Sequence, residues 1–270
     1  MLPVVEMFTS IQGEGKYTGQ PSHFVRVSGC NLRCVFKDSV CDTPYSSFCP
    51  EKSITDTMDN LINQFNELHL KSPWVRHVVI TGGEPLMYKK DLEEFLSAIY
   101  MDDMVITIET NGTMPILNPT NPKFRVDLYS VSPKLITSVA SKPGIYGGQN
   151  VSQEMIDRHN KSRINIDNLV NIVQYANDYQ FKFVYSGHES LEEIMNIYTL
   201  MGQKVLTLSD AEQIHYTYNH PNNHTMLMPE GITNEQLAAK RQEIVDVCIN
   251  QGWMYTDRLH IIIWGDKRGV

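Results

Sequence analysis

Three cysteines lie within twelve residues near the start of the chain, at Cys30, Cys34 and Cys41, in the stretch CNLRCVFKDSVCDT. Two further cysteines, Cys49 and Cys248, bring the total to five. An odd number of cysteines argues against a disulfide framework, whereas thiolates are common ligands of zinc and of iron–sulfur clusters. The three close cysteines therefore indicate a metal or cluster site.

Their spacing alone leaves two kinds of site open. A structural zinc ion takes four ligands, which Cys30, Cys34, Cys41 and Cys49 would provide. A 4Fe–4S cluster held by only three thiolates instead leaves one iron free for a ligand that takes part in chemistry. Cys248 falls in a helical pattern, which favours a buried structural residue.

Polar residues also follow several apolar runs. TGGEP at 81–85 comes directly after one such run, and its glycines would let a ligand approach the backbone. IETNGT at 108–113 and SVSPKL at 130–135 have the same form. Open α/β folds bind ligands at the carboxyl ends of their strands, so these residues are candidates for one site. A plain turn between a strand and a helix is the alternative reading of TGGEP.

The order and combination of these motifs resemble the radical S-adenosylmethionine (AdoMet) enzymes and, within them, the 7-carboxy-7-deazaguanine synthase family. The matching stretches run to residue 270 and are IQGEGKYTGQPSHFVRVSGCNLRC, CDT, HVVITGGEP, IETNGT, SVSPKL, FKFV, LMPEGIT and RLHIIIWGDKRGV. TGGEP alone would be weak evidence, but QGEG, SPK and WGDKRGV beside the cysteines form a specific combination.

One feature departs from the family pattern. In the superfamily, two residues usually separate the third cysteine from the second, and the corresponding position in this chain holds Lys37. Asp42 and Thr43 follow Cys41 as they follow the third cysteine in the family, so we place a four-residue insertion before Cys41. Lengthening a loop costs little entropy, so the three thiolates can still converge. Cys49 is the competing third ligand.

The resemblance implies a 4Fe–4S cluster on Cys30, Cys34 and Cys41, with AdoMet bound at the open iron and cleaved to give a radical. It implies Thr43 as a ligand of Mg²⁺, a cation that prefers oxygen. The residues that it implies for AdoMet binding are Gly82, Gly83, Glu84, Glu109, Asn111, Ser132 and Lys134.

The implied reaction is the ring contraction of 6-carboxy-5,6,7,8-tetrahydropterin to 7-carboxy-7-deazaguanine with loss of ammonia, in 7-deazapurine (queuosine-type) biosynthesis. Arg26 offers a planar fork of donors for a carboxylate or a pterin carbonyl, and Glu14 an acceptor for a guanidine-like edge. The residues implied for substrate binding are Ile11, Gln12, Gly13, Glu14, Arg26, Thr81, Arg258 and His260. The alternatives are another radical AdoMet enzyme, such as a glycyl-radical activase, and a non-catalytic zinc-binding protein.

Composition limits the partners. The net charge is −8, so the chain is poorly suited to non-specific binding of nucleic-acid phosphates. No apolar run approaches the roughly 20 residues of a membrane span, and the first residues lack the pattern of a secretory signal, so we expect a cytoplasmic protein. The family resemblance implies an electron donor such as flavodoxin or ferredoxin, and a homodimer.

Strands and helices are expected to alternate along the chain, and these elements must position the motifs. Strands are expected at 23–29, 77–83, 104–112, 124–134, 181–187 and 224–231. Helices are expected at 53–70 with Ser53 as the cap, at 91–100, at 167–176, around 191–198, and from the capping box of Thr233 and Gln236 to about Gln251, where Gly252 would end the last helix.

Alternating strands and helices predict a mainly parallel sheet with helices outside. About six units fit, which is too few for an eight-fold barrel, so we expect a partial (β/α)6-type open barrel. A doubly wound open sheet is the alternative. We interpret residues 1–270 as a single radical AdoMet domain, with loop insertions near 136–161 and 209–223.

The placement of the third cluster ligand is directly testable. Replacing Cys41 with Ala should abolish activity, because the cluster would lose a thiolate, whereas Cys49→Ala should leave activity unchanged. Assays of the two variants after anaerobic reconstitution distinguish them. The reverse result would move the third ligand to Cys49.

Overall fold

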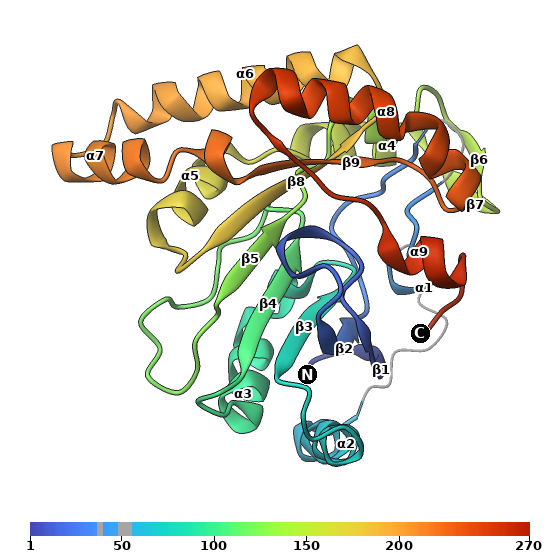
Figure 1. Cartoon of the computed structure of the whole chain (residues 1–270), viewed down its shortest axis with the longest axis vertical. Helices are drawn as coiled ribbons and strands as arrows, with labels where there is room; N and C mark the ends of the chain where they lie inside the picture. The colour runs from blue at the N-terminus through green and yellow to red at the C-terminus, as the bar shows by residue number, and fades with distance from the viewer. Residues whose placement is uncertain (37–39, 48–55) are drawn as a thin grey trace.

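The computed structural model describes residues 1–36, 40–47 and 56–270 of the chain. One sheet of eight strands dominates it, in the order β1-β2-β3-β4-β5-β8-β9-β10 (Figure 1). Strand β1 runs antiparallel to β2, and every later neighbouring pair is parallel. The strands are β1 (Val4–Ile11), β2 (Pro21–Val27), β3 (His77–Gly82), β4 (Val105–Thr110), β5 (Leu128–Val131), β8 (Tyr179–Tyr185), β9 (Thr225–Pro229) and β10 (Met254–Tyr255).

The strand order settles the fold class. The strands of this sheet lie side by side in the same order in which they follow one another in the sequence. The order therefore never reverses, as it does in a doubly wound sheet. The ends of the sheet, β1 and β10, are not paired with each other, so the barrel stays open. The expected partial open barrel is confirmed, and its six longer parallel strands are the six expected ones.

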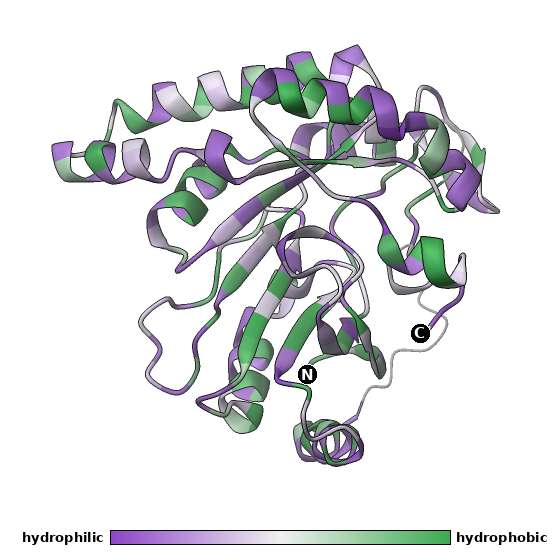
Figure 2. Cartoon of the chain, in the orientation of Figure 1, coloured by the Kyte–Doolittle hydropathy of each residue, from purple (hydrophilic) through white to green (hydrophobic). Residues whose placement is uncertain are grey.

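The helices are α1 (Pro44–Ser47), α2 (Met58–Lys71), α3 (Lys89–Ile99), α4 (Gln153–Ser162), α5 (Ile166–Tyr175), α6 (His188–Val205), α7 (Asp210–Tyr218), α8 (Asn234–Gln251) and α9 (Leu259–Trp264). Of these, α2, α3, α5, α6 and α8 lie outside the curved sheet (Figure 1). Apolar residues concentrate on the strands and on the helix faces turned toward them, as in the edge-to-face pair of Phe65 and Phe95 (Figure 2). No helix in the described part of the chain has the length and apolar character that a membrane crossing requires.

The ends of one helix follow directly from sequence. Thr233 and Gln236 form the expected capping box of α8, and Gly252 ends this helix in the left-handed conformation at φ 69°. The start of α2 was predicted wrongly: this helix begins at Met58, and Thr57 caps it by accepting from the Asn60 amide. Ser53, the expected cap, lies outside the described residues.

The two expected loop insertions contain regular structure, so their interpretation as loops was wrong. The first holds the hairpin of β6 (Gly144–Tyr146) and β7 (Gln149–Val151) and most of α4. The second is largely α7, which begins at a capping box of Ser209 and Glu212. Both helices bury few apolar side chains, and so neither carries a clear apolar stripe in the sequence.

The capping box of α8 gives a stability prediction. Thr233→Ala removes the hydroxyl that accepts from the Gln236 amide and should lower the free energy of unfolding by about 1 kcal/mol. Urea unfolding monitored by circular dichroism measures the change. Thr199→Ala, at an exposed position inside α6, is the control and should change stability by less than about 0.5 kcal/mol. An equal loss in both variants would contradict the capping role.

Candidate active site

A cavity of about 280 Å³ lies at the carboxyl ends of the parallel strands. Its lining begins at Phe8 and ends at Val270, so it draws on nearly the whole length of the chain. Among the expected site residues, it is lined by Ile11, Gln12, Gly13, Glu14, Arg26, Cys30, Cys34, Cys41, Thr43, Thr81, Gly82, Gly83, Glu109, Asn111, Ser132, Lys134, Arg258 and His260. Only Glu84 of the expected set is missing from the wall.

The connection between β1 and β2 forms one side of this cavity. The Gln12 side chain donates to the Glu109 carboxylate on β4 at 3.2 Å, and the other oxygen of that carboxylate accepts from Thr81 at 2.8 Å. The backbone of the same connection reaches the chain after β10, because the Leu259 amide donates to the Gly13 carbonyl at 2.9 Å. These bonds hold the expected substrate-binding stretch against both halves of the sheet.

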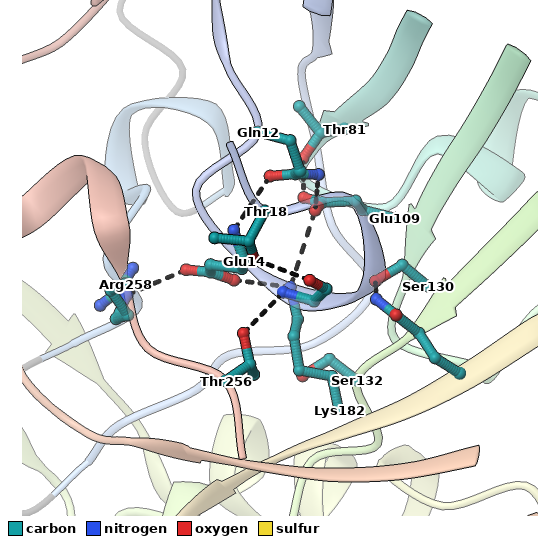
Figure 3. Close-up of polar contacts among 12 residues, drawn as sticks. Gln12, Glu14, Thr18, Thr81, Glu109, Ser130, Ser132, Lys182, Thr256 and Arg258 are labelled. Carbon is teal, nitrogen blue, oxygen red and sulfur yellow. Dashed lines mark hydrogen bonds and ion pairs between the residues drawn. The ribbon is translucent and has the colours of Figure 1, made fainter. Parts of the chain in front are cut away.

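Five charged side chains of the cavity wall form a chain of ion pairs, and Figure 3 shows four of them: Arg258, Glu14, Lys182 and Glu109. The Arg258 guanidinium lies 2.9 Å from Glu14, and Lys182 lies 2.5 Å from the other Glu14 oxygen. Lys182 also lies 3.6 Å from Glu109, and Arg258 makes a further ion pair with Asp42. Burial by itself raises the pKa of Glu14, but Lys182, Arg258 and His260 together hold it far below its ordinary value. Glu14 is therefore ionised at neutral pH.

The three close cysteines border this cavity without any disulfide bond. The Cys41 amide donates to the Cys34 carbonyl at 3.1 Å, so the loop folds back on itself. Burial raises the pKa of Cys30 to about 11 and raises that of Cys34, while the nearby Lys134 acts in the opposite direction. Thiolates at these positions need a bound cation, which the iron of a cluster provides.

Cys30, Cys34 and Cys41 line one cavity, which is what a cluster that binds each thiolate at a different iron requires. In the described residues, no three His, Cys, Asp or Glu side chains are grouped closely enough to hold a metal ion. The irons of a 4Fe–4S cluster occupy separate corners, so three thiolates need to face one space rather than meet at one point. Cys49, the competing ligand, lies outside the described residues, and Cys248 is buried in α8 as expected.

The glycines after β3 pack directly on the cysteine loop. A Cβ atom on Gly83 would lie 1.8 Å from the Gly29 carbonyl oxygen, and the Glu84 amide donates to the same oxygen at 2.8 Å. Gly82 has φ 120°, where a side chain would be strained. These two glycines therefore allow the strand end to lie against the cysteine loop, in addition to bordering the cavity.

Glu84 differs from its expected position. Its side chain is completely buried, and its carboxylate accepts from Thr110 at 2.8 Å and from the Asn111 and Leu86 amides at 2.7 and 3.1 Å. Burial raises its pKa although these hydrogen bonds oppose the shift. Glu84 therefore ties the end of β3 to the end of β4 and holds Asn111 in place.

Asn111 joins the end of β4 to the cysteine loop, because its side chain donates to Asn31, next to Cys30, at 2.9 Å. The Lys134 ammonium donates to the Ser132 hydroxyl at 2.9 Å, and the Ser132 amide is bonded to the end of β4. Lys134 also lies near enough to Cys30 for its charge to lower the pKa of that thiol. Asn111 and Lys134 are therefore both close to the cysteines.

The remaining expected residues occupy a second part of the wall. Arg26 lies 2.7 Å from Glu6, and its guanidinium carbon is 5.8 Å from the ring centres of Phe8 and Tyr45. The Thr43 hydroxyl lies 3.5 Å from the Cys41 sulfur. The His260 ring fills the space that a side chain at Gly13 would need, 2.0 Å from a Cβ there.

Sequence reasoning missed Lys182, Tyr45 and the residues after α9. Lys182 is buried in β8 with Phe181 and Phe183 on either side. A lysine inside the apolar run FKFV could have been recognised as a buried charge that needs a partner. At the end of the chain, Arg268 lies over the Tyr45 ring at 3.3 Å and borders the cavity. No local pattern relates two residues so far apart in sequence.

Comparisons with known proteins agree with this geometry. The family model described as the Radical SAM superfamily matches residues 24–201. A 7-carboxy-7-deazaguanine synthase from Halobacterium salinarum is 35% identical over 98% of this chain and 91% of its own length. One from Rhodopirellula baltica is 37% identical, over 100% of this chain and 89% of its own length. The crystal structure of QueE from Escherichia coli shares the fold with a TM-score of 0.54 and 21% identity, over 96% of this chain and 94% of that one.

The buried charge chain predicts a pH-dependent loss of stability. Lys182→Met removes the cation that lies between Glu14 and Glu109 and leaves Glu14 paired with Arg258 alone of its two close cations, and it should cost about 3–5 kcal/mol at pH 7. The lowered pKa of Glu14 stabilises the fold above the ordinary carboxyl range, and this contribution falls as the pH drops below that range toward the much lower pKa of the folded state. The deficit of the variant should therefore be constant near neutral pH and shrink as the pH falls below about 4, as urea titrations at several pH values would measure.

Lys16→Met is the matched control. Lys16 also pairs with a carboxylate, Asp178, but its side chain is 48% exposed. Its loss should cost less than about 1 kcal/mol. A Lys182 variant as stable as this control, or one whose deficit is independent of pH, would contradict the proposed role of the charge chain.

Proposed function

The chain belongs to the radical SAM superfamily and, within it, to the 7-carboxy-7-deazaguanine synthases, and we propose that it converts 6-carboxy-5,6,7,8-tetrahydropterin to 7-carboxy-7-deazaguanine with loss of ammonia. This reaction serves 7-deazapurine biosynthesis of the queuosine type. The observation that carries the proposal is that one cavity gathers the cysteines with all but one of the residues expected to bind AdoMet and the pterin.

The cysteine end of the cavity is suited to the cofactors. Cys30, Cys34 and Cys41 would hold the cluster, and the backbone of Gly82 and Gly83 would lie along AdoMet. When bound, the cluster and AdoMet together supply the radical that removes a hydrogen atom from the substrate. Asn111, Ser132, Lys134 and Glu109 would fix AdoMet by hydrogen bonds, and Glu84 would act by positioning Asn111.

The charged end of the cavity is suited to the pterin. The guanidine-like edge of a pterin donates hydrogen bonds, and the ionised Glu14 carboxylate is an acceptor for that edge. Arg26 would bind a carbonyl or the carboxylate through its planar guanidinium. Ile11, Gln12, Gly13, Thr81, Arg258 and His260 would complete the binding surface. The role of these residues is to orient one substrate hydrogen toward the cofactor and to exclude competing reactions.

Mg²⁺ would bind at Thr43. This hydroxyl borders the cavity between the cysteines and the charged residues, and Asp42 follows Cys41 immediately. Magnesium prefers oxygen ligands and commonly uses few protein groups together with substrate oxygens and water. A hydroxyl and substrate oxygens would therefore be enough for an ion that orients the substrate.

We further propose that residues 1–270 act as one radical AdoMet domain, because the residues that line the cavity run from Phe8 to Val270. Free cysteines favour a reducing compartment such as the cytoplasm. The family resemblance favours a homodimer, and the exposed Ile262, Ile263 and Trp264 of α9 are candidates for its interface. Flavodoxin or ferredoxin would donate the electron.

Turnover of the pterin tests the proposal. The anaerobically reconstituted chain, incubated with AdoMet, a reductant, Mg²⁺ and the carboxypterin, should form 7-carboxy-7-deazaguanine without consuming stoichiometric AdoMet. Chromatography with mass spectrometry detects the product, and omission of Mg²⁺ should lower the rate.

Two results would contradict the proposal. A colourless protein that contains zinc and no sulfide would favour a zinc-binding protein. A brown iron–sulfur protein that cleaves AdoMet but leaves the carboxypterin unchanged would favour another radical AdoMet activity. Iron, zinc and sulfide analyses of the same preparation separate these outcomes.

A further inference from the structure

The segment between β5 and β8 supports the cysteine loop from the side away from the charged residues. The Val35 amide donates to the Ser138 carbonyl at 2.8 Å. Val35 and Val40, which form an isolated bridge within the cysteine loop, pack with three residues of this segment in a small apolar cluster separate from the main core. The three partners are Ala140, Val151 and Ile156. The hairpin of β6 and β7 and helix α4 therefore give the lengthened loop a surface to pack on.

His159 of α4 makes the most specific contact in this region. Its side chain is buried, and its Nδ1 atom accepts from the Arg33 amide at 3.1 Å. Arg33 lies between Cys30 and Cys34, and its guanidinium donates to the Cys30 and Leu32 carbonyls at 2.7 and 2.8 Å. The imidazole thus holds the backbone of the residue directly before Cys34, in the stretch that joins two of the three cysteines.

The other ring nitrogen fixes the orientation of the imidazole. Because Nδ1 accepts, Nε2 carries the proton, and it faces the Ser138 hydroxyl at 3.2 Å. That hydroxyl in turn donates to the Leu135 carbonyl at 2.6 Å. Donors and acceptors are consistent from Arg33 through His159 and Ser138 to Leu135. Burial, with Arg163 and Lys134, lowers the pKa of His159 to about 4, in agreement with a neutral ring.

We propose that His159 is a positioning residue for the three-cysteine loop, and that it sets the separation of Cys30 from Cys34 by anchoring the Arg33 backbone to helix α4. The inference rests on the proposed function, because the loop must hold a cluster for its spacing to matter. Fixing the Arg33 backbone to α4 removes part of the conformational freedom of the stretch from Cys30 to Cys34.

The experiment measures retention of the cluster in the full, anaerobically reconstituted chain. His159→Leu removes the acceptor and leaves the Arg33 amide unpaired, so a chelator should extract iron at least about tenfold faster than from the wild type. His159→Asn places a side-chain oxygen near the position of Nδ1 and should restore release to within about threefold of the wild type. The AdoMet-induced change in the electron paramagnetic resonance spectrum of the reduced cluster should be altered in the Leu variant and retained in the Asn variant.

Ser152→Ala is the matched control, because it removes the cap of α4 without touching the cysteine loop. Iron release from it should stay within about twofold of the wild type, even if thermal unfolding occurs earlier. Equal acceleration in the Ser152 and His159→Leu variants would overturn the inference, because general weakening of α4 would then explain both. Release at the wild-type rate from His159→Leu would also overturn it.

Ser138→Ala keeps the test decisive if His159→Leu fails to fold. Without the Ser138 hydroxyl the ring loses its second anchor, and release should accelerate about threefold or more, whereas an unchanged rate would overturn the inference. Cluster uptake by the wild-type chain tests the proposed function separately. If the wild-type chain takes up no cluster, the proposed function is wrong, whatever the variants show.

Discussion

The contact between Glu14 and Arg258 joins the two edges of an open barrel, and the arrangement of the cavity depends on it. Glu14 follows the edge strand β1, and Arg258 follows β10 at the other edge, so their ion pair spans a gap that no strand pairing closes. Two backbone bonds reinforce it: the Gly15 amide donates to the Thr256 hydroxyl, and the Leu259 amide to the Gly13 carbonyl. This junction brings the end of the chain to the cavity.

Such a junction must be fully paired, because isolated charges are costly to bury. Glu14 has two cationic partners, Lys182 has two carboxylates, and Arg258 also donates to the Gly231 carbonyl at 2.6 Å. Under the proposed function, the residues that join the two edges of the open sheet would also contact the polar substrate. One set of charges would then serve both the structure and substrate recognition.

Much of the architecture could be predicted from sequence. The six longer parallel strands follow from apolar runs at regular intervals, and the ends of α8 follow from Thr233, Gln236 and Gly252, which act through contacts a few residues away. The start of α2 and the helices α4 and α7 were missed, although the capping box of Ser209 and Glu212 was readable. Helix α4 is hard to recognise because its apolar partners belong to the cysteine loop more than a hundred residues earlier.

The candidate site, like the fold, was predictable from the sequence only in part. The sequence by itself determined the residue types: three cysteines, glycines after a strand, and carboxylates and cations near strand ends, since short motifs encode local chemistry. Only the tertiary structure decided that Glu84 is enclosed by Thr110 and Asn111 and that Lys182 pairs with Glu14. It alone brought His159 against the cysteine loop. These relations join distant segments whose separation in space is set by the curvature and openness of the sheet, which no local pattern specifies.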